Sequence, residues 1–281
     1  MLADVIDCLA CPHCGENLSI SASTVRCATG HSFDIARQGY VSLLPGDAHT
    51  GTADTTAMVA ARETFLAAGH YAEISRAVAD ATERALVDAG PGCVIDVGSG
   101  TGYYLAAVLE RLPERVGIAL DISKYALRRA ARAHPHIGAV AGDVWRRLPV
   151  RTGSVAAVLD VFAPRNAAEF RRVLAPDGVL IVVIPDRNHL ARLVETLDLL
   201  DVDVGKEARL ATQLAQGFER VAVYRVEGPL ELTHAEVDAA VAMGPSAHHV
   251  DPADIDVRVA ALAEPVRTRL SVTVAVYKSA R

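Results

Sequence analysis

Four of the five cysteines lie within the first 27 residues, and their spacing is that of metal ligands. In the turn CPHCG, the thiols of Cys11 and Cys14 can reach one ion, while the proline and the glycine shape the turn. Cys27 and His31 form a second turn, with a glycine directly before the histidine. The order C-x2-C-x12-C-x3-H matches a Cys3His set for tetrahedral zinc.

Two neighbours are rival ligands. Cys8 lies two residues before the first knuckle cysteine and would replace His31 in an alternative set, but CLAC lacks the proline and glycine of a knuckle. His13 lies inside the knuckle, and we expect its side chain to point away. We therefore predict the Cys3His set, with Cys8 packed as a small hydrophobe. Four protein ligands leave no open position for a substrate, so the zinc is expected to be structural.

A glycine-rich loop follows a hydrophobic strand pattern in VIDVGSGTGYY, residues 94–104. Glycines without Cβ atoms let the turn tighten and the backbone approach a ligand. The G-x-G-x-G spacing differs from the G-x-G-x-x-G of a pyrophosphate site and fits S-adenosylmethionine, which has no phosphate. The predicted cofactor residues here are Asp96, Gly98, Gly100, Thr101 and Gly102.

Two acidic residues end the next strand patterns. Asp121 ends GIALD, where a carboxylate can accept hydrogen bonds from both ribose hydroxyls, and Asp143 ends VAGD, close to where an adenine amino group would lie. Either residue alone is as well explained as a helix cap. The glycine loop, Asp121 and Asp143 follow one another at the carboxyl ends of strands of one sheet. Together they indicate an S-adenosylmethionine-dependent methyltransferase.

The sheet that must position these residues is also predicted. Short apolar runs alternate with amphipathic helical patterns, which predicts βαβ units and a parallel sheet. Alternating patterns at 220–228 and 269–279 predict an antiparallel pair at its edge, which is typical of an α/β class I (Rossmann-like) methyltransferase. The apolar runs are 93–98, 116–121, 137–143, 155–162 and 178–185, and the helical patterns are 102–112, 123–133 and 166–174.

Composition divides the chain into three parts. Residues 1–45 carry the cysteines and a predicted hairpin, and we expect them to form a small zinc-binding module. Residues 46–60 are expected to form a linker, and residues 61–281 the methyltransferase domain. The acidic N-terminal sequence and the absence of a long apolar run predict a cytoplasmic protein without a membrane partner, where clustered cysteines favour metal over disulfides.

The zinc pattern, followed by GHSFDIARQGYVSLLPG, AARETFLAAGHY, DVGSGTGYY, FAPRN and PDRNHL, resembles the bacterial 23S rRNA (guanine-N1)-methyltransferases. Within that family the chain is most similar to the actinobacterial tylosin-resistance branch, notably in RRAARAHP, DVWRRLP and VAMGPSAHH. The resemblance extends over nearly the whole chain. It implies methyl transfer to N1 of a guanine in a hairpin of 23S rRNA domain II, expected at guanine 748, where the methyl group interferes with certain macrolides.

The resemblance also implies residue roles. The four predicted zinc ligands match those of the family, and Tyr71 and His189 match positions that contact S-adenosylmethionine. The residues alone explain Tyr71 equally well as a packing residue and His189 as a surface histidine. Asp160, in LDVFAPRN, is a candidate for the base that accepts the N1 proton. Phe162, in the same stretch, is a candidate for stacking on the flipped guanine. Their alternatives are a polar strand end and a core residue.

The net charge of −6 argues weakly against a large electrostatic footprint on nucleic acid. Residues 1–50 contain only Arg26 and Arg37 against five acidic residues, so we expect Arg165 and Arg187 to act with them in binding RNA. A homodimer, in which a second copy completes the RNA cleft, is one arrangement that this charge suggests.

Two other functions fit parts of the sequence. A methyltransferase for a small molecule would share the sheet and the glycine loop and would suit the negative charge, but not the zinc knuckle. A zinc-ribbon protein could bind S-adenosylmethionine without turnover, but the complete set of loop glycines and strand-end carboxylates argues against decay of the active site.

Overall fold

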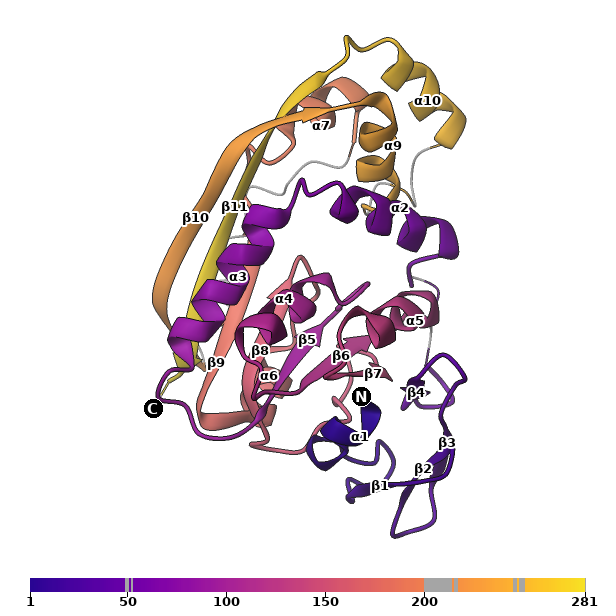
Figure 1. Cartoon of the computed structure of the whole chain (residues 1–281), viewed down its shortest axis with the longest axis vertical. Coiled ribbons are helices and arrows are strands. Elements are labelled where there is room, and N and C mark those ends of the chain that lie inside the picture. Colours follow the sequence, from indigo (N-terminus) through magenta and orange to yellow (C-terminus); the bar gives the residue numbers. More distant parts are fainter. Residues whose placement is uncertain are drawn as a thin grey trace.

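The computed structural model describes residues 1–48, 51, 53–199, 214, 217–244, 247 and 251–280. A central eight-stranded sheet carries most of the elements, and a small three-stranded sheet lies at one end of the molecule (Figure 1). The central strands are β4 (Tyr40–Ser42), β5 (Cys93–Val97), β6 (Gly117–Asp121), β7 (Ile137–Ala141), β8 (Val155–Val161), β9 (Leu174–Pro185), β10 (Phe218–Leu232) and β11 (Val266–Ser279).

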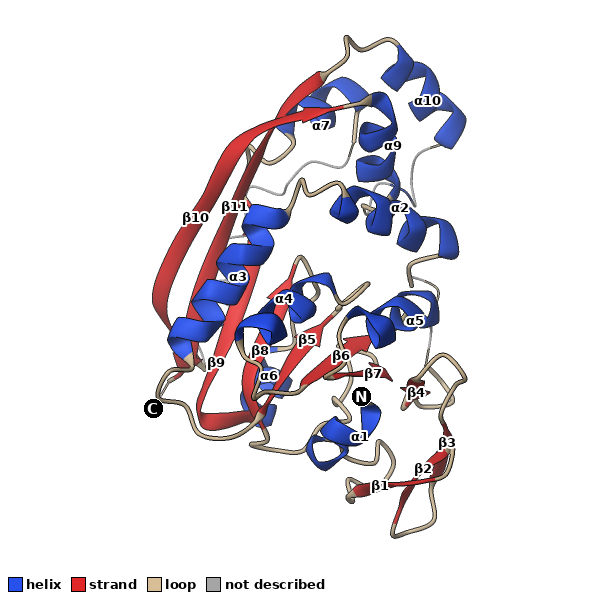
Figure 2. Ribbon diagram, viewed as in Figure 1, coloured by secondary structure: helices blue, strands red, loops and turns tan. Residues whose placement is uncertain are grey.

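The strand order of the central sheet is β10-β11-β9-β8-β5-β6-β7-β4. The six strands from β9 to β4 are parallel, while β11 pairs antiparallel with β9 and β10 antiparallel with β11. The predicted α/β methyltransferase architecture is thereby confirmed. β10 and β11 are longer than their sequence patterns indicated, and they continue past the sheet as a two-stranded ribbon (Figure 2).

Helices cover the sheet and its carboxyl edge. Two helices, α2 and α3, precede β5, separated by a turn at Gly69 with a positive φ. None of the helices in the described part of the chain is long and apolar enough to cross a membrane. The larger helices are α2 (Thr56–Ala67), α3 (Ala72–Ala85), α4 (Tyr103–Arg111), α5 (Lys124–Ala133), α6 (Ala167–Val173), α7 (Ala191–Leu197), α9 (His234–Ala242) and α10 (Pro252–Ala260).

The small sheet consists of β1 (Leu18–Ser21), β2 (Thr24–Cys27) and β3 (Ser32–Asp34), all antiparallel. The hairpin predicted from the sequence is its first two strands.

The N-terminal 45 residues are attached to the large sheet at several places. β4 pairs with β7 as a parallel edge strand, which the sequence did not predict. Helix α1 (Leu2–Val5) packs on the same strand, where a Cβ at Gly138 would collide with Val5. Leu9 forms a bridge with Val150, and buried side chains of both parts belong to one hydrophobic cluster. The division of the chain at residue 45 stays a prediction, but the two parts share a core.

Candidate active site and metal centre

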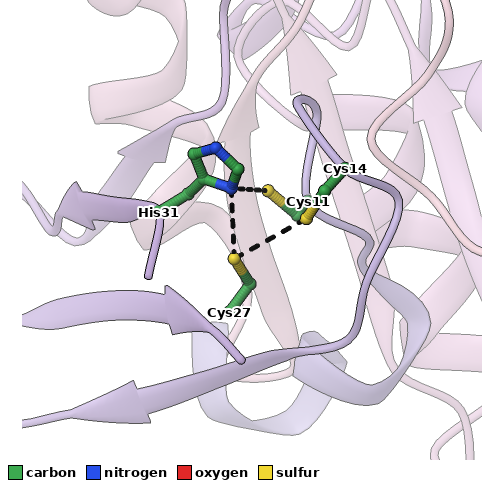
Figure 3. A group of neighbouring side chains, drawn as sticks. All are labelled: Cys11, Cys14, Cys27 and His31. Atoms are coloured by element: carbon green, nitrogen blue, oxygen red, sulfur yellow. Dashed lines mark hydrogen bonds between the residues drawn. The ribbon is translucent and has the colours of Figure 1, made fainter. Parts of the chain in front are cut away.

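The four predicted zinc ligands come together at one point. Figure 3 shows the two turns that carry them, one before β1 and the other between β2 and β3. Cys27 Sγ lies 3.7 Å from Cys14 Sγ and 3.3 Å from His31 Nδ1, and Cys11 Sγ lies 3.6 Å from the same nitrogen. Tetrahedral zinc holds sulfur and nitrogen ligands roughly 3.5–3.8 Å apart. The donor set and its spacing therefore fit a zinc ion.

A hydroxyl group beside the cluster favours the thiolate form that binds metal. Thr29 Oγ1 lies 3.0 Å from both Cys14 Sγ and Cys27 Sγ. Its hydrogen bond is the main cause that lowers the pKa of Cys27 to about 6, so this residue is largely a thiolate at neutral pH.

The two rival ligands lie outside the cluster. Cys8 Sγ is 3.9 Å from the carbonyl oxygen of Ser154, which belongs to the large domain. The ring of His13 stacks on Phe33, with their centroids 5.8 Å apart. Among the described residues, the cluster that could hold an ion consists of the four predicted ligands, and they leave the ion no open position for a substrate.

The glycine loop joins β5 to α4 in a conformation that requires glycine. Gly98, Gly100 and Gly102 have φ values of +70°, +54° and +79°. A Cβ at Gly98 would lie 2.8 Å from Ala163 Cβ, which is closer than side chains approach in proteins. The loop is therefore packed directly against the turn that follows β8.

Asp121, at the end of β6, is tied to this loop. Its carboxylate accepts hydrogen bonds from the backbone N–H of Gly100 and of Ser123, both at 2.8 Å. Burial raises the pKa of this carboxyl group, and the two backbone donors oppose that shift. Each oxygen keeps lone-pair capacity for a further donor, such as a ribose hydroxyl.

Asp96 is only 1% exposed, and its Oδ2 has no hydrogen-bond partner among the described residues. Burial raises its pKa well above the ordinary value, and the charges of Asp121 and Asp160 add to the shift. A cationic ligand placed among these carboxylates would relieve both effects. S-adenosylmethionine has a sulfonium and an ammonium group, so the residues fit this cofactor.

The other predicted loop and strand-end residues lie at the same edge of the sheet. Thr101 is partly buried within the glycine loop. Asp143 follows β7, and its Oδ1 accepts a hydrogen bond of 2.9 Å from the backbone N–H of Trp145. The backbone N–H of Gly142 donates to the carbonyl oxygen of Asp121, which keeps the two strand ends adjacent.

Sequence reasoning missed Arg62, on α2. Its Cδ lies 3.3 Å from the position that a Cβ on Gly100 would take. One Nη donates to Asp54 Oδ2 at 2.7 Å and to the carbonyl oxygen of Met243 at 2.9 Å, and the buried Nε has no hydrogen-bond partner among the described residues. The arginine stands in AARETFLAAGHY, but no local spacing singled it out from the other arginines of the chain.

Tyr71 and His189 form a buried pair above the loop. Tyr71 Oη lies 2.9 Å from His189 Nε2, and the backbone N–H of Ser271 donates to Nδ1 at 3.3 Å. Because Nδ1 accepts, the proton of the neutral imidazole belongs on Nε2, which donates to Tyr71 Oη. The tyrosine hydroxyl, whose pKa burial raises, keeps its own proton for another acceptor. His189 is thus a buried residue and not a surface histidine.

The position of His189 predicts a pH dependence of stability. Burial lowers its pKa from 6.5 to about 4. Between these values the unfolded chain takes up a proton that the folded chain does not, so the free energy of unfolding falls as the pH falls through this window. We expect the free energy of unfolding of the unmodified protein to fall by about 2 kcal/mol from pH 7 to pH 5, and His189→Gln should not show this loss. Urea unfolding at both pH values measures it, and equal losses in the two proteins would contradict this account.

Phe162 stands in a strained backbone conformation at the end of β8. Its φ is +57°, which is unusual for a bulky residue, and 36% of its surface is exposed. Its ring is 6.0 Å from that of His189 in a stacked arrangement, and 6.1 Å from that of Tyr71. The structure therefore keeps an aromatic face beside the predicted cofactor residues Tyr71 and His189 and partly open to solvent.

Asp160 is fully buried beneath this turn, and its Oδ1 lies 3.4 Å from Arg165 Nη2. The side chain of Arg165 is only 11% exposed, so its charge serves the buried carboxylate, whereas the sequence suggested a contact with RNA phosphate. Arg187, like Arg26 and Arg37, is exposed. The roles expected for these residues in binding RNA stay predictions.

Two segments of the chain match known protein families. Residues 9–50 match a zinc-ribbon family described as "RlmA, N-terminal", and residues 94–178 match a family described as "Methyltransferase domain". A protein of Streptomyces fradiae named 23S rRNA (guanine(748)-N(1))-methyltransferase is 49% identical, over 99% of each chain. The chain belongs to the 23S rRNA (guanine-N1)-methyltransferase family.

Two further relatives are also named as 23S rRNA (guanine-N1)-methyltransferases. One, from Micromonospora griseorubida, is 50% identical over 99% of each chain. The other, from Bacillus subtilis, is 28% identical over 66% of this chain and 67% of its own. The resemblance stated from the sequence is confirmed, and the chain is an S-adenosylmethionine-dependent methyltransferase with an N-terminal zinc ribbon.

Proposed function

We propose that this enzyme methylates N1 of the guanine at position 748, in a hairpin of 23S rRNA domain II. The observation that carries the proposal is the 49% identity, over 99% of both chains, with a Streptomyces fradiae enzyme named for that nucleotide. A methyl group there interferes with certain macrolides, so tylosin resistance is the proposed consequence. An rRNA substrate agrees with the cytoplasmic location expected from the sequence.

S-adenosylmethionine supplies an electrophilic methyl group on a positively charged sulfur. Asp121 would accept hydrogen bonds from its ribose hydroxyls, and Asp143 lies where an adenine amino group would be bound. The buried Asp96 carboxylate suits the ammonium group. The Nε of Arg62, which has no hydrogen-bond partner in the described part of the chain, suits the carboxylate of the same arm. Tyr71, with its available hydroxyl proton, and His189 would close the site from the side of β11.

Methyl transfer in line with the leaving sulfur depends chiefly on placing the acceptor nitrogen correctly. N1 of a paired guanine is hidden inside the base pair, so the base must leave the stack. The ring of Phe162, which is partly exposed on a strained backbone, offers a surface on which the flipped guanine stacks. Asp160, at the end of β8 beneath this turn, is the proposed acceptor of the N1 proton, and Arg165 is paired with it.

Asp160→Asn tests the proposed base. The variant keeps the size of the side chain but removes the proton acceptor, so we expect kcat to fall at least about 100-fold. The KM for RNA should stay within about twofold, and kcat is measured with the cofactor at saturation because the variant also removes one negative charge near Asp96. A variant with unchanged kcat would show that another group, or water, accepts the proton.

The proposed function is tested with purified enzyme and a domain II hairpin transcript. After incubation with S-adenosylmethionine, the RNA is digested to nucleosides and separated by mass spectrometry against a 1-methylguanosine standard. We expect one 1-methylguanosine per hairpin, lost when the target guanine is replaced by adenine. Methyl transfer to another atom, or equal transfer to both transcripts, would contradict the proposal. A homodimer is part of the same proposal, and sedimentation of the enzyme with and without the transcript tests it.

A further inference from the structure

The chain contains one tryptophan, Trp145, and its side chain is 68% exposed. It stands in the loop after β7, between the buried residues Val144 and Leu148. Its neighbours along the loop are the charged residues Asp143, Arg146 and Arg147. A single large aromatic side chain among charged residues does not suit the core of a protein–protein interface, because such cores are depleted of charged residues.

This loop is held firmly although its indole faces solvent. Asn166 Nδ2 donates to the carbonyl oxygen of Val144 at 2.9 Å, and the backbone N–H of Leu148 donates to Glu169 Oε2 at 2.8 Å. Arg172 donates to the carbonyl oxygen of Leu148 at 3.0 Å. The exposure of Trp145 is therefore a property of a well-anchored loop, which gives a pre-organised surface for a ligand.

The loop lies between the two functional parts of the enzyme. On one side, the backbone N–H of Trp145 donates to Asp143, which is at the cofactor edge of the sheet. On the other side, the residues that follow the loop bind the segment just before the zinc knuckle: Ala10 N–H donates to the carbonyl oxygen of Pro149 at 3.0 Å. Arg151 N–H donates in the same way to Cys8, at 2.9 Å.

Unpaired RNA bases are recognised by stacking on aromatic side chains, with arginines that contact the phosphates nearby. Trp145 supplies the flat face. Arg147 is exposed beside it, and Arg146 is partly exposed and held by Asp47 at 2.9 Å. The same loop is joined to the segment that carries Phe162, because Asn166 Nδ2 donates to the carbonyl oxygen of Val144.

We propose that Trp145 stacks on an unpaired base of the rRNA hairpin, distinct from the methylated guanine, and so fixes the hairpin between the zinc ribbon and the methyl-donor site. The inference rests on the proposed function, because it names how the same substrate is bound. In this role Trp145 is a substrate-positioning residue and takes no part in the chemical step.

The single tryptophan makes the test direct, because the intrinsic fluorescence of the protein above 330 nm comes from this residue alone. The domain II hairpin transcript is titrated into the enzyme saturated with S-adenosylhomocysteine. We expect strong quenching that saturates with the same dissociation constant as filter binding. Trp145→Ala should raise that constant and the KM for RNA about tenfold or more, with kcat and cofactor affinity unchanged. Trp145→Phe should restore most of the affinity, and Val87→Ala, another exposed apolar position, should change nothing.

The outcomes separate the two proposals. A methylated hairpin that neither quenches Trp145 nor loses affinity in Trp145→Ala would contradict the stacking inference alone. Quenching and tenfold weaker binding by Trp145→Ala, without any methylation of the hairpin, would support the stacking and contradict the proposed function. If the hairpin neither quenches the fluorescence of Trp145 nor is methylated, both proposals are wrong.

Discussion

Cys14→Ser is expected to lose the zinc ion and to lower methylation of the rRNA hairpin more than about 100-fold. Structural zinc in small domains contributes about 10–16 kcal/mol of apparent binding free energy, and a serine hydroxyl is a poor substitute for a thiolate. Loss of the ion frees the two turns that carry the ligands. Because the segment beside the knuckle is bound to Pro149 and Arg151, the effect should reach the loop of Trp145 as well. Zinc content by atomic emission and hairpin methylation are measured on the same preparation.

Cys8→Ser is the matched control for this prediction. Cys8 belongs to the same stretch, but its sulfur points to the carbonyl oxygen of Ser154 and lies outside the ligand cluster. We expect this variant to keep one zinc ion and to methylate the hairpin at nearly the normal rate. The dissociation constant for S-adenosylmethionine should change little in either variant, since the glycine loop lies in another element. A zinc-free Cys14→Ser protein that still methylates RNA would show that the zinc ribbon is dispensable.

Asp121→Asn is expected to weaken S-adenosylmethionine binding about 100-fold or more. The carboxylate accepts from two backbone N–H groups and would accept from the ribose, whereas an amide must turn one N–H₂ group toward a donor. The loss of charge-assisted hydrogen bonds is worth roughly 3 kcal/mol, which corresponds to this change in affinity. Titration calorimetry with the cofactor measures it directly.

Asp88→Asn controls for the general effect of removing one negative charge, because Asp88 lies exposed beyond α3. It should leave the cofactor affinity within about twofold. The affinity of Asp121→Asn for the hairpin transcript should also stay close to normal, since Asp121 is half-buried and its carboxylate is bound to the glycine loop. An Asp121→Asn protein with normal cofactor affinity would mean that the ribose binds elsewhere.

The parts of the site that depend on local geometry were predictable from the sequence. The zinc ligands lie in two short turns, where proline, glycine and cysteine spacing determines which side chains converge. The glycine loop and Asp121 follow from strands whose ends meet at one sheet edge. Fold and cofactor were predictable for the same reason: alternating short strands and helices leave few arrangements for a parallel sheet.

Features that depend on tertiary pairing were not predictable. β4 is three residues long, and its pairing with β7 joins segments about 100 residues apart in the sequence. Arg62 was missed because its partners, Asp54 and the carbonyl oxygen of Met243, meet only in the folded chain. The pairing of Arg165 with the buried Asp160 was likewise not indicated by the sequence, and the role expected for Arg165 in binding RNA stays a prediction. β7 and the carbonyl oxygen of Met243 are remote in sequence from their partners, whereas Asp54 and Asp160 lie only a few residues from theirs, at spacings that no sequence pattern singles out.

Primer extension on 23S rRNA is the most direct test of the central claim. The enzyme is produced in a host that lacks the related methyltransferase, and reverse transcription is followed through domain II, where a methyl group on N1 of guanine blocks the polymerase. We predict one new stop at guanine 748, absent with Asp121→Asn. An enzyme that binds S-adenosylmethionine normally but produces no stop in domain II would contradict the claim.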